Sequence, residues 1–254
     1  MKISIIIPVY NEEKYIEKAL NSLVCQEERA DEIIVVDNNC TDKTIEIVKK
    51  FKNKLPLKII KEKIQGITPA RNKGFNNANG NILVKFDADG QLPKNWIKKV
   101  KNIFKKDKKI VAYSNHFYLY DMRFFNRCLL PSILYQFFFK ILSGYGVLLG
   151  PAFAIRRNVW EKIKNEICLD DKKVHEDIDI TIHISPFGKI YIDKELIINV
   201  SSRRIKYNPL SFFIVYPIRF LQMLASHRKQ LSQGSGLLRF FIFSKPFQSR
   251  KTQS

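Results

Sequence analysis

The stretch ILVKFDADG, residues 82–90, decides the fold. Its first five residues are mostly apolar, as is typical of a buried β-strand. The strand runs directly into Asp87, Ala88 and Asp89, so two carboxylates stand at its carboxyl end, where open α/β sheets bind ligands. Such oxygen ligands suit Mg²⁺ or Mn²⁺ bridged to substrate phosphates. Asp-x-Asp triplets are common by chance, so the interpretation of this triplet as a metal site depends on the apolar strand that comes directly before it.

Outward from this segment, apolar runs and amphipathic patterns alternate along the first half of the chain. We expect strands at residues 3–9, 33–36, 57–60, 82–86 and 110–114, and helices at 12–26, 41–51, 69–78 and 93–104. This spacing is typical of βαβ units and predicts an α/β fold with a mostly parallel, Rossmann-like central sheet flanked by helices. In the less regular second half, we expect strands near 148–155, 189–192 and 196–200, and helices at 158–163 and 176–185.

The composition restricts the class of protein and of partner. A chain of 254 residues that is 45% hydrophobic can bury a full core. Its 44 Lys and Arg against 24 Asp and Glu give a net charge of +20, which favours polyanions such as nucleic acid, anionic lipid or phosphorylated substrates. The four cysteines are scattered without a Cys-x-x-Cys pair, which favours a reducing, cytoplasmic setting. We expect neither a signal peptide nor a transmembrane helix.

Two further motifs follow predicted strands. In PVYNE, residues 8–12, a short loop would let backbone groups and the Glu12 carboxylate face a nucleotide, but an ordinary strand-to-helix turn also fits. In VVDNNCTD, residues 35–42, Asp37 stands at a strand end, where an acid can bind a ribose or base or can instead cap a helix. Neither motif decides between its two interpretations on its own.

Basic and histidine side chains add weaker signals. Arg71, within ARNKG at residues 70–74, could bind a diphosphate through its planar donors or could be a solvated arginine on an exposed helix. His175 and His183 lie near the acidic pair Glu176-Asp177. We interpret these two histidines as surface or supporting residues rather than metal ligands.

Taken together, these motifs resemble a known family. PVYNE, VVDNNCTDKT, G-x-x-x-A-R-N-x-G, FDADG and a later Glu176-Asp177 pair occur in the order and approximate spacing of the family 2 glycosyltransferases. The resemblance covers about residues 1–200 and implies the GT-A fold and an inverting reaction. Two departures, Asn38-Asn39-Cys40 in place of Asp-Gly-Ser and Gly90 in place of an acid, leave the choice of nucleotide open.

The resemblance also implies a role for each matching residue. It assigns the nucleotide-sugar pocket to Pro8, Val9, Tyr10, Glu12, Asp37, Asn39, Arg71, Asp87 and Ala88. Within this set, Asp37 would contact the base, Arg71 would approach the donor phosphates, and Asp87 would face the ribose or the metal. Asp89, together with Asp87, would ligate Mn²⁺ or Mg²⁺. Asp177 would be the catalytic base, and Glu176, Gly150 and Arg156 would lie on the acceptor side or support the base.

The expected reaction follows from these roles. An inverting hexosyltransferase would move a sugar from a nucleoside-diphosphate sugar, with UDP favoured over GDP and dTDP, to a hydroxyl of a glycan or lipid-linked acceptor in cell-wall biogenesis. A carboxylate base takes the proton of the acceptor hydroxyl, and a metal offsets charge on the leaving diphosphate. The Gln-x-x-Arg-Trp motif of processive synthases is absent after Asp177, which favours the transfer of single sugars.

The expected organisation is a catalytic domain at residues 1–205, with a nucleotide-sugar half at 1–115 and an acceptor-side half at 116–205, followed by a basic, aromatic-rich helical extension at 206–254. The extension suits an interfacial helix on an anionic membrane, which would place the chain at the inner face of the plasma membrane. It equally suits a helix packed on the catalytic domain. RNA binding is a third interpretation, but no nucleic-acid-binding module is recognisable, so no specific nucleic acid is expected.

Two other functions compete with glycosyl transfer. A nucleotidyltransferase would share the α/β scaffold, but the glycine-rich loop that would cradle a triphosphate is missing. A non-catalytic, basic membrane or nucleic-acid adaptor could retain the same fold, because fold alone does not prove activity.

Overall fold

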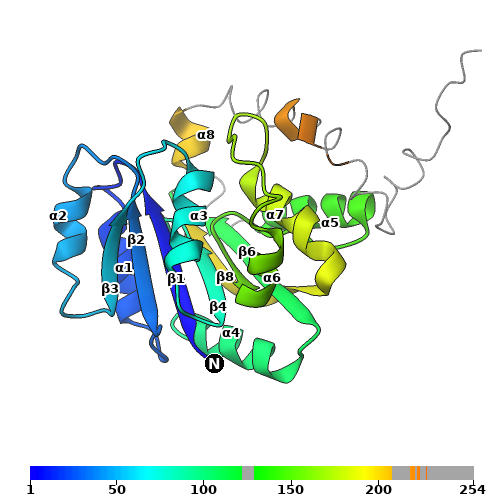
Figure 1. Ribbon diagram of the computed structural model, residues 1–254, viewed down its shortest axis with the longest axis horizontal. Coiled ribbons are helices and arrows are strands. Elements are labelled where there is room, and N and C mark those ends of the chain that lie inside the picture. The colour runs from blue at the N-terminus through cyan, green and yellow to red at the C-terminus, as the bar shows by residue number, and fades with distance from the viewer. Residues whose placement is uncertain (122–128, 208–217, 221, 224–226, 228–254) are drawn as a thin grey trace, which may run out of the picture.

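A single eight-stranded sheet forms the centre of the molecule (Figure 1). The computed structural model describes residues 1–121, 129–207, 218–220, 222–223 and 227. The strands are β1 (Ile3–Val9), β2 (Glu32–Asp37), β3 (Leu57–Lys61), β4 (Ile82–Phe86), β5 (Gly90–Gln91), β6 (Ile110–Leu119), β7 (Ala152–Arg156) and β8 (Lys189–Val200). Their order across the sheet is β3-β2-β1-β4-β7-β6-β8-β5. The first four are mutually parallel, and β7 runs antiparallel to both β4 and β6.

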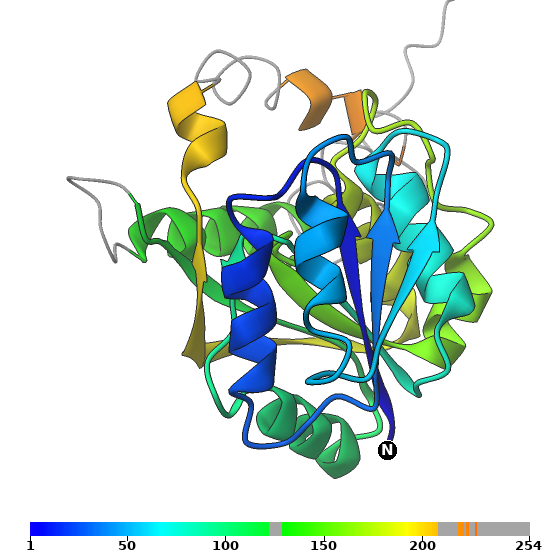
Figure 2. The same cartoon turned by 90° about the vertical axis from the view of Figure 1, so that its left-hand side faces the viewer.

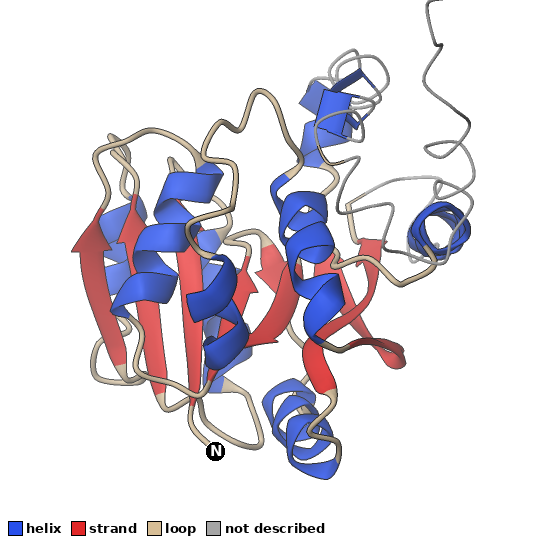
Figure 3. Cartoon of the chain, turned by 45° about the vertical axis from the view of Figure 1, so that its right-hand side comes forward, coloured by secondary structure: helices blue, strands red, loops and turns tan. Residues whose placement is uncertain are grey.

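Helices cover both faces of this sheet (Figure 3). They are α1 (Ile16–Val24), α2 (Thr44–Lys49), α3 (Ile67–Asn77), α4 (Trp96–Lys106), α5 (Leu130–Ser143), α6 (Arg157–Ile163), α7 (Glu176–Ile184), the short 3-10 helix η1 (Ser185–Phe187) and α8 (Arg203–Tyr207). The core on one face takes side chains from α1, α2 and α4, and the core on the other takes them from α3, α6 and α7. Figure 2 shows α1 on the side of the parallel strands opposite α3.

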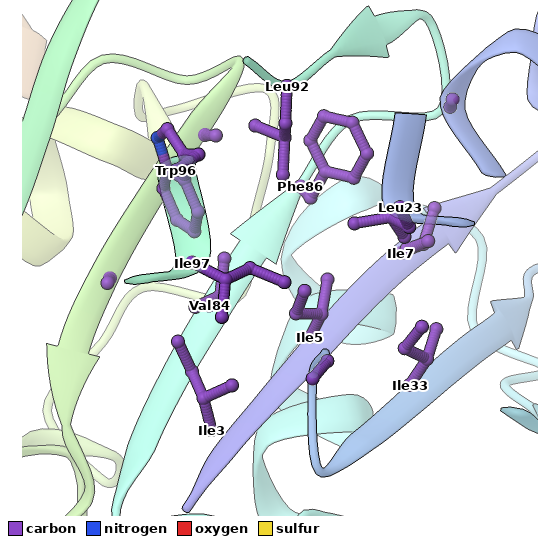
Figure 4. Packing of buried hydrophobic residues seen from close by; sticks show 14 of the residues in the cluster. Ile3, Ile5, Ile7, Leu23, Ile33, Val84, Phe86, Leu92, Trp96 and Ile97 are labelled. Atoms are coloured by element: carbon purple, nitrogen blue, oxygen red, sulfur yellow. The ribbon is translucent and has the colours of Figure 1, made fainter. Parts of the chain in front are cut away.

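Two-residue alternation along the strands explains why one sheet has two cores. In β1, Ile5 and Ile7 point into the first core, and Ile6 between them points into the second. Figure 4 shows Ile5 and Ile7 packed with Leu23 of α1 and Val84 of β4. Continuous apolar runs are expected for strands that are buried on both faces. The predicted α/β fold with a mostly parallel sheet is therefore confirmed.

Element boundaries depart from the predictions where the backbone has other partners. Helix α1 begins at Ile16 rather than at residue 12, because residues 12–15 form a turn in which the Glu12 carbonyl accepts the N–H groups of Tyr15 and Ile16. The two strands predicted at 189–192 and 196–200 are one strand, β8, which pairs with β6 through two register shifts. The strand predicted from residue 148 begins only at Ala152.

The described part of the C-terminal extension packs on the catalytic domain. Met223 and Phe220 join an apolar cluster with Phe139 of α5 and with Ile178 and Ile182 of α7. The remainder of the extension lies outside the described residues. The expected domain divisions fall inside elements, with 115/116 in β6 and 205/206 in α8. Within the described ranges, none of the helices is long and apolar enough to cross a membrane.

Candidate functional site

A cavity of about 220 Å³ lies at the carboxyl ends of the parallel strands. Because β1, β2 and β4 run in one direction, the loops that follow them meet at one edge of the sheet. The cavity is lined by Pro8, Val9, Tyr10, Glu12, Asn38, Gln65, Gly66, Ile67, Ala70, Asp87, Ala88 and Arg203. Six of the nine residues expected in the donor pocket are on this list, whereas Asp37, Asn39 and Arg71 are not.

Asparagine side chains hold the first two loops in shape. Asn11 and Asn39 have positive φ angles of 54° and 69°, a conformation that asparagine adopts more readily than most residues. Asn11 Oδ1 accepts the Thr41 N–H at 2.8 Å, which joins the two loops. Asn38 Oδ1 accepts the Gly66 N–H at 2.8 Å, and Asn39 Nδ2 donates to the Lys63 carbonyl at 2.9 Å. The departure to Asn38-Asn39 therefore fixes the segment that forms the cavity wall.

Asp37 supports its own loop in this structure. Its carboxylate is buried and accepts the backbone N–H of Cys40 at 2.9 Å. Asp37 does not cap a helix, because α2 begins only later, at Thr44, whose N–H is accepted by Asp42 at 3.0 Å. Contact of Asp37 with a base stays a prediction.

The two acids of the Asp-x-Asp triplet are both paired with cations. The Asp87 carboxylate lies 2.6 Å from Lys85 Nζ, and Asp89, which is 5% exposed, lies 3.0 Å from Arg203 Nε. Arg203 also forms a two-pronged ion pair with Glu12 across the cavity, and its guanidinium lies 4.6 Å from the centre of the Tyr15 ring. Burial raises the pKa of Glu12, even though Arg203 acts to lower it.

Arg203 is a site residue that the sequence did not single out. Strand β5, immediately after Asp89, pairs with the end of β8, with Gly90 opposite Val200. This pairing places residues 201–203 beside the acidic loop, although they are more than a hundred residues away along the chain. The paired arginines Arg203-Arg204 gave no distinguishing signal among the many basic residues.

Lys85 connects the acidic loop to the start of α7. It is 1% exposed, and its Nζ contacts Asp87 Oδ1, donates to the Gly150 carbonyl and lies 3.2 Å from Glu176 Oε1. In β4, Leu83 points into the core beneath α3 and α7, so alternation directs Lys85 to the same side. The sequence does contain a signal for Lys85, since it stands within an otherwise apolar strand. A charge buried in such a strand requires partners of opposite charge.

Arg71 also binds Glu176 rather than lining the cavity. Its guanidinium is fully buried, donates to Asn72 Oδ1 at 2.9 and 3.0 Å, and donates to both the carboxylate and the backbone carbonyl of Glu176. The solvated-arginine interpretation is therefore wrong. Burial acts to raise the pKa of Glu176, but Lys85 and Arg71 hold it below its ordinary value.

Asp177 occupies the first turn of α7, next to this ion-pair network. Its Oδ1 accepts the N–H of Ile178 at 2.9 Å. A Cβ added to Gly150 would lie 3.2 Å from Asp177 Oδ2, so the glycine leaves room directly beside the carboxylate. Burial, and then the neighbouring Glu176 carboxylate, raise the pKa of Asp177 above its ordinary value. A carboxyl group with a raised pKa is suited to general-base chemistry near neutral pH.

The expectation for Arg156 is wrong. In the antiparallel pairing of β7 with β4, Arg156 is opposite Ile82, whereas Ala152 is opposite Phe86 at the acidic end. Arg156 thus lies at the edge of the sheet opposite the Asp-x-Asp loop, and its guanidinium donates to the carbonyls of Ile110, Phe104 and Asp107. Gly150 and Glu176, in contrast, adjoin Asp177.

The side chains of the acidic loop fit a hard divalent cation. Asp87 and Asp89 supply carboxylate oxygens, which Mg²⁺ and Mn²⁺ prefer. Their present pairing with Lys85 and Arg203 shows that positive charge is already favoured at this point. Asp89 and Asp87 are the residues that would hold the metal.

Comparison with known proteins identifies the family and the fold. The family model described as "Glycosyl transferase family 2" matches residues 4–164. Poly(ribitol-phosphate) beta-N-acetylglucosaminyltransferase TarS of Staphylococcus aureus is 39% identical over 102 residues, which are 39% of this chain and 18% of TarS. Probable glycosyltransferase YdaM of Bacillus subtilis is 31% identical over 208 residues, which are 74% of this chain and 47% of YdaM. The chain therefore spans less than half the length of these curated relatives.

Solved structures share the fold at lower identity. The crystal structure of S. aureus TarS 1-349 in complex with UDP-GlcNAc has a TM-score of 0.65 and 23% identity, and the match covers 92% of this chain and 71% of that one. The mannosyltransferase PcManGT from Pyrobaculum calidifontis, in complex with GDP-Man and Mn²⁺, has a TM-score of 0.69 and 22% identity, with 92% and 65% covered.

Proposed function

Since this chain belongs to glycosyl transferase family 2, we propose that it transfers a hexosyl group from a nucleoside-diphosphate sugar, with UDP favoured, to a hydroxyl of a cell-envelope glycan or lipid-linked acceptor. The favoured donor agrees with the UDP-GlcNAc bound to TarS, whereas the GDP-Man bound to PcManGT keeps GDP-sugars as competitors. The nucleotidyltransferase alternative has no comparable support.

The observation that carries the proposal is the chain of contacts from the acidic loop to Asp177. Lys85 Nζ lies 2.6 Å from Asp87 and 3.2 Å from Glu176, the neighbour of Asp177. One buried lysine thus separates the expected position of the leaving diphosphate from the expected base. This arrangement suits a displacement in which the acceptor hydroxyl and the leaving group lie on opposite sides of one sugar carbon.

The proposed reaction uses the residues of this chain as follows. Asp177 takes the proton of the acceptor hydroxyl, the hydroxyl oxygen forms a bond to the anomeric carbon, and the bond from that carbon to the diphosphate breaks with inversion. Lys85 and Arg71 keep Glu176 ionised and hold it beside the base. Mn²⁺ or Mg²⁺, held by Asp89 and Asp87, would stabilise the charge of the diphosphate.

Arg203 is proposed to bind the donor diphosphate. It lines the cavity, and in this structure it binds two carboxylates, those of Glu12 and Asp89. A guanidinium binds phosphate in the same two-pronged geometry as carboxylate. On donor binding, Arg203 would therefore exchange the carboxylates of Glu12 and Asp89 for the phosphate oxygens of the donor.

Donor binding and turnover test the proposal. Binding of UDP-, GDP- and dTDP-sugars with Mn²⁺ or Mg²⁺ is measured by calorimetry, and transfer or slow hydrolysis by nucleotide release. Asp177→Asn should lower kcat about 10²- to 10⁴-fold and leave donor affinity unchanged, whereas Asp89→Ala should weaken metal-dependent binding. Asp31→Asn serves as the control, because this acid precedes β2 and its carboxylate accepts the Ile3 N–H at the amino end of β1, away from the cavity. Donor binding without transfer in every acceptor context would instead support the non-catalytic adaptor.

Peripheral membrane contact at the inner face of the plasma membrane is part of the proposal. Helix α5 exposes Leu134, Phe137 and Phe138, each more than half accessible, on a chain of net charge +20. Exposed apolar side chains favour insertion at a membrane interface, and a net positive charge on the protein favours an anionic one. Sedimentation with phosphatidylglycerol vesicles should fall for Phe137→Ser relative to wild type, and equal sedimentation of the two proteins would contradict this part.

A further inference from the structure

Helix α7 carries a second group of potential metal ligands, distinct from the acidic loop. Asp179 and His183 lie one turn apart on this helix, and His227 approaches them from the C-terminal segment. One ligand atom from each residue lies within 4.8 Å of those of the other two, and all three side chains are buried. Figure 1 draws the described pieces of the C-terminal segment in orange, above α5 and α7.

The Asp179 carboxylate is the centre of this group. Its Oδ1 lies 3.0 Å from Nε2 of His227 and 3.7 Å from Nδ1 of His183, and its Oδ2 accepts the Cys168 N–H at 3.2 Å. The side chain has no exposure to solvent, and Oδ1 receives no well-aligned hydrogen bond. A fully buried carboxylate needs a compensating positive charge, and its ion-pair partners among the described residues are these two imidazoles.

Backbone hydrogen bonds orient both imidazole rings. Nδ1 of His183 lies 2.8 Å from the Asp179 carbonyl, and Nδ1 of His227 lies 3.0 Å from the Met223 carbonyl. A carbonyl can only accept, so an Nδ1 that makes this contact carries a proton, and the lone pair of a neutral ring is then on Nε2. For His227 this is the nitrogen that lies 3.0 Å from Asp179, and fixing Nδ1 is how proteins orient histidines that bind metals through Nε2. For His183 the nitrogen that lies 3.7 Å from Asp179 is Nδ1, so metal binding through that atom requires the ring to give up its contact with the Asp179 carbonyl. The two rings are nearly perpendicular, at 87°, with centres 5.1 Å apart.

The surroundings leave this group little access to water, with Asp179 fully buried and His183 and His227 only 6% and 7% exposed. Ile178 and Ile182 of α7 pack with Phe139 and Met223 in the apolar cluster beside it. An apolar shell strengthens the interaction between a cation and its ligands. Two imidazoles and one carboxylate suit Zn²⁺ better than Mg²⁺, which prefers oxygen ligands alone.

From these contacts we propose that Asp179, His183 and His227 form a Zn²⁺ site that fastens the C-terminal segment to α7. Zinc binds imidazole nitrogen and carboxylate oxygen at about 2.0–2.2 Å, so the ligand atoms need to approach one another by roughly 1 Å or more. Water completes the coordination. From the sequence alone, His183 was interpreted as a surface or supporting residue; its side chain is buried, and the proposal gives it the role of a ligand.

The site has a consequence for the helix that carries the proposed base. Asp179 is two residues after Asp177, so a metal on Asp179 would immobilise the first turn of α7. The Zn²⁺ site itself does not depend on the proposed glycosyl transfer, because its ligands are separate from Asp87, Asp89 and Asp177.

Zinc binding to the full, untagged chain tests the proposal. The protein is stripped of metal and titrated with Zn²⁺ in an Asp89→Ala background, which removes a carboxylate of the acidic loop from the measurement. We expect one Zn²⁺ per chain, a rise in melting temperature on binding, and a loss of affinity of at least about tenfold in His183→Gln and in His227→Gln. His116→Gln changes a buried histidine that contacts Ser132 elsewhere in the molecule and should bind Zn²⁺ like the parent.

A spectroscopic measurement keeps the test decisive if a variant fails to fold. Co²⁺ added to the metal-free parent should give the visible absorption of a four-coordinate site, and Zn²⁺ should displace that band. Absence of Zn²⁺ binding near neutral pH, or equal affinity in the parent and in folded His227→Gln, would overturn the proposal. The cluster would then be a protonated imidazole paired with Asp179.

Discussion

Replacing Lys85 by methionine tests the connection between the acidic loop and α7. The substitution keeps the length of the side chain and removes its charge, which leaves Asp87 and Glu176 without a shared cation. Breaking a buried ion pair by removing one partner costs about 3–5 kcal/mol. Glu176 retains Arg71, and the Asp87 side chain is 14% exposed, so we expect the lower end, about 3 kcal/mol. For a chain of this size, that loss lowers the melting temperature by about 6–12 °C.

Urea unfolding followed by circular dichroism measures this loss, with Lys101→Met as the matched control. Lys101 is also a buried lysine with two acidic partners, but those partners, Glu28 and Asp31, are 41% and 36% exposed and can return to water. We therefore expect Lys101→Met to cost only about 1 kcal/mol. Equal losses in the two variants at equal m-values would refute the claim that Lys85 holds a buried network together.

Three further predictions concern pH, packing and the cavity. Because the pKa of Asp177 is raised, kcat/KM should begin to fall on acidification at a higher pH than for an ordinary aspartate, and a rate profile that stays flat down to the ordinary carboxyl range would contradict this. Gly74→Ala should destabilise the protein by about 1–3 kcal/mol in urea unfolding, because the new Cβ would lie 2.3 Å from Ile6 Cγ2. This clash opposes the higher helix propensity of alanine, and unchanged stability would show that α3 can move away from β1. Arg203→Gln should weaken donor binding about 10-fold or more in calorimetry, through loss of a charge-assisted contact with the diphosphate, and unchanged affinity would contradict its proposed role.

Local patterns predicted the nucleotide-binding half of the fold closely. Residues 82–86 form the predicted strand, and β1, β2 and β3 lie within one residue of their predicted positions at each end. Parallel strands buried on both faces require continuous apolar runs, and such runs are visible in a sequence without any knowledge of contacts. The family resemblance assigned Pro8, Val9, Glu12 and Asp87 to one pocket, and they line one cavity because they lie at or just after the carboxyl ends of the parallel strands β1 and β4.

The partners of charged side chains could not be predicted in this way. Arg71 was expected at the phosphates and instead binds Glu176, and Arg156 was expected on the acceptor side and instead lies at the opposite edge of the sheet. Both outcomes depend on strand direction and on which helix covers which face. The local sequence around an arginine is the same whether its guanidinium binds a phosphate, a buried carboxylate or a backbone carbonyl, so it does not predict the partner.

The sequence by itself determined the fold class, the family resemblance and the acids at the strand ends, because these depend on periodicity and order along the chain. Only the tertiary structure decided that Lys85 joins Asp87 to Glu176, that Arg203 reaches Asp89, and that His227 meets Asp179. Each of these contacts joins residues from different elements, and two of them depend on the chain returning to α7 or the acidic loop after β8. A buried charged side chain needs a partner of opposite charge, and the packing of the elements decides which residue that partner is. The local sequence does not encode which residues, distant along the chain, become neighbours in the fold.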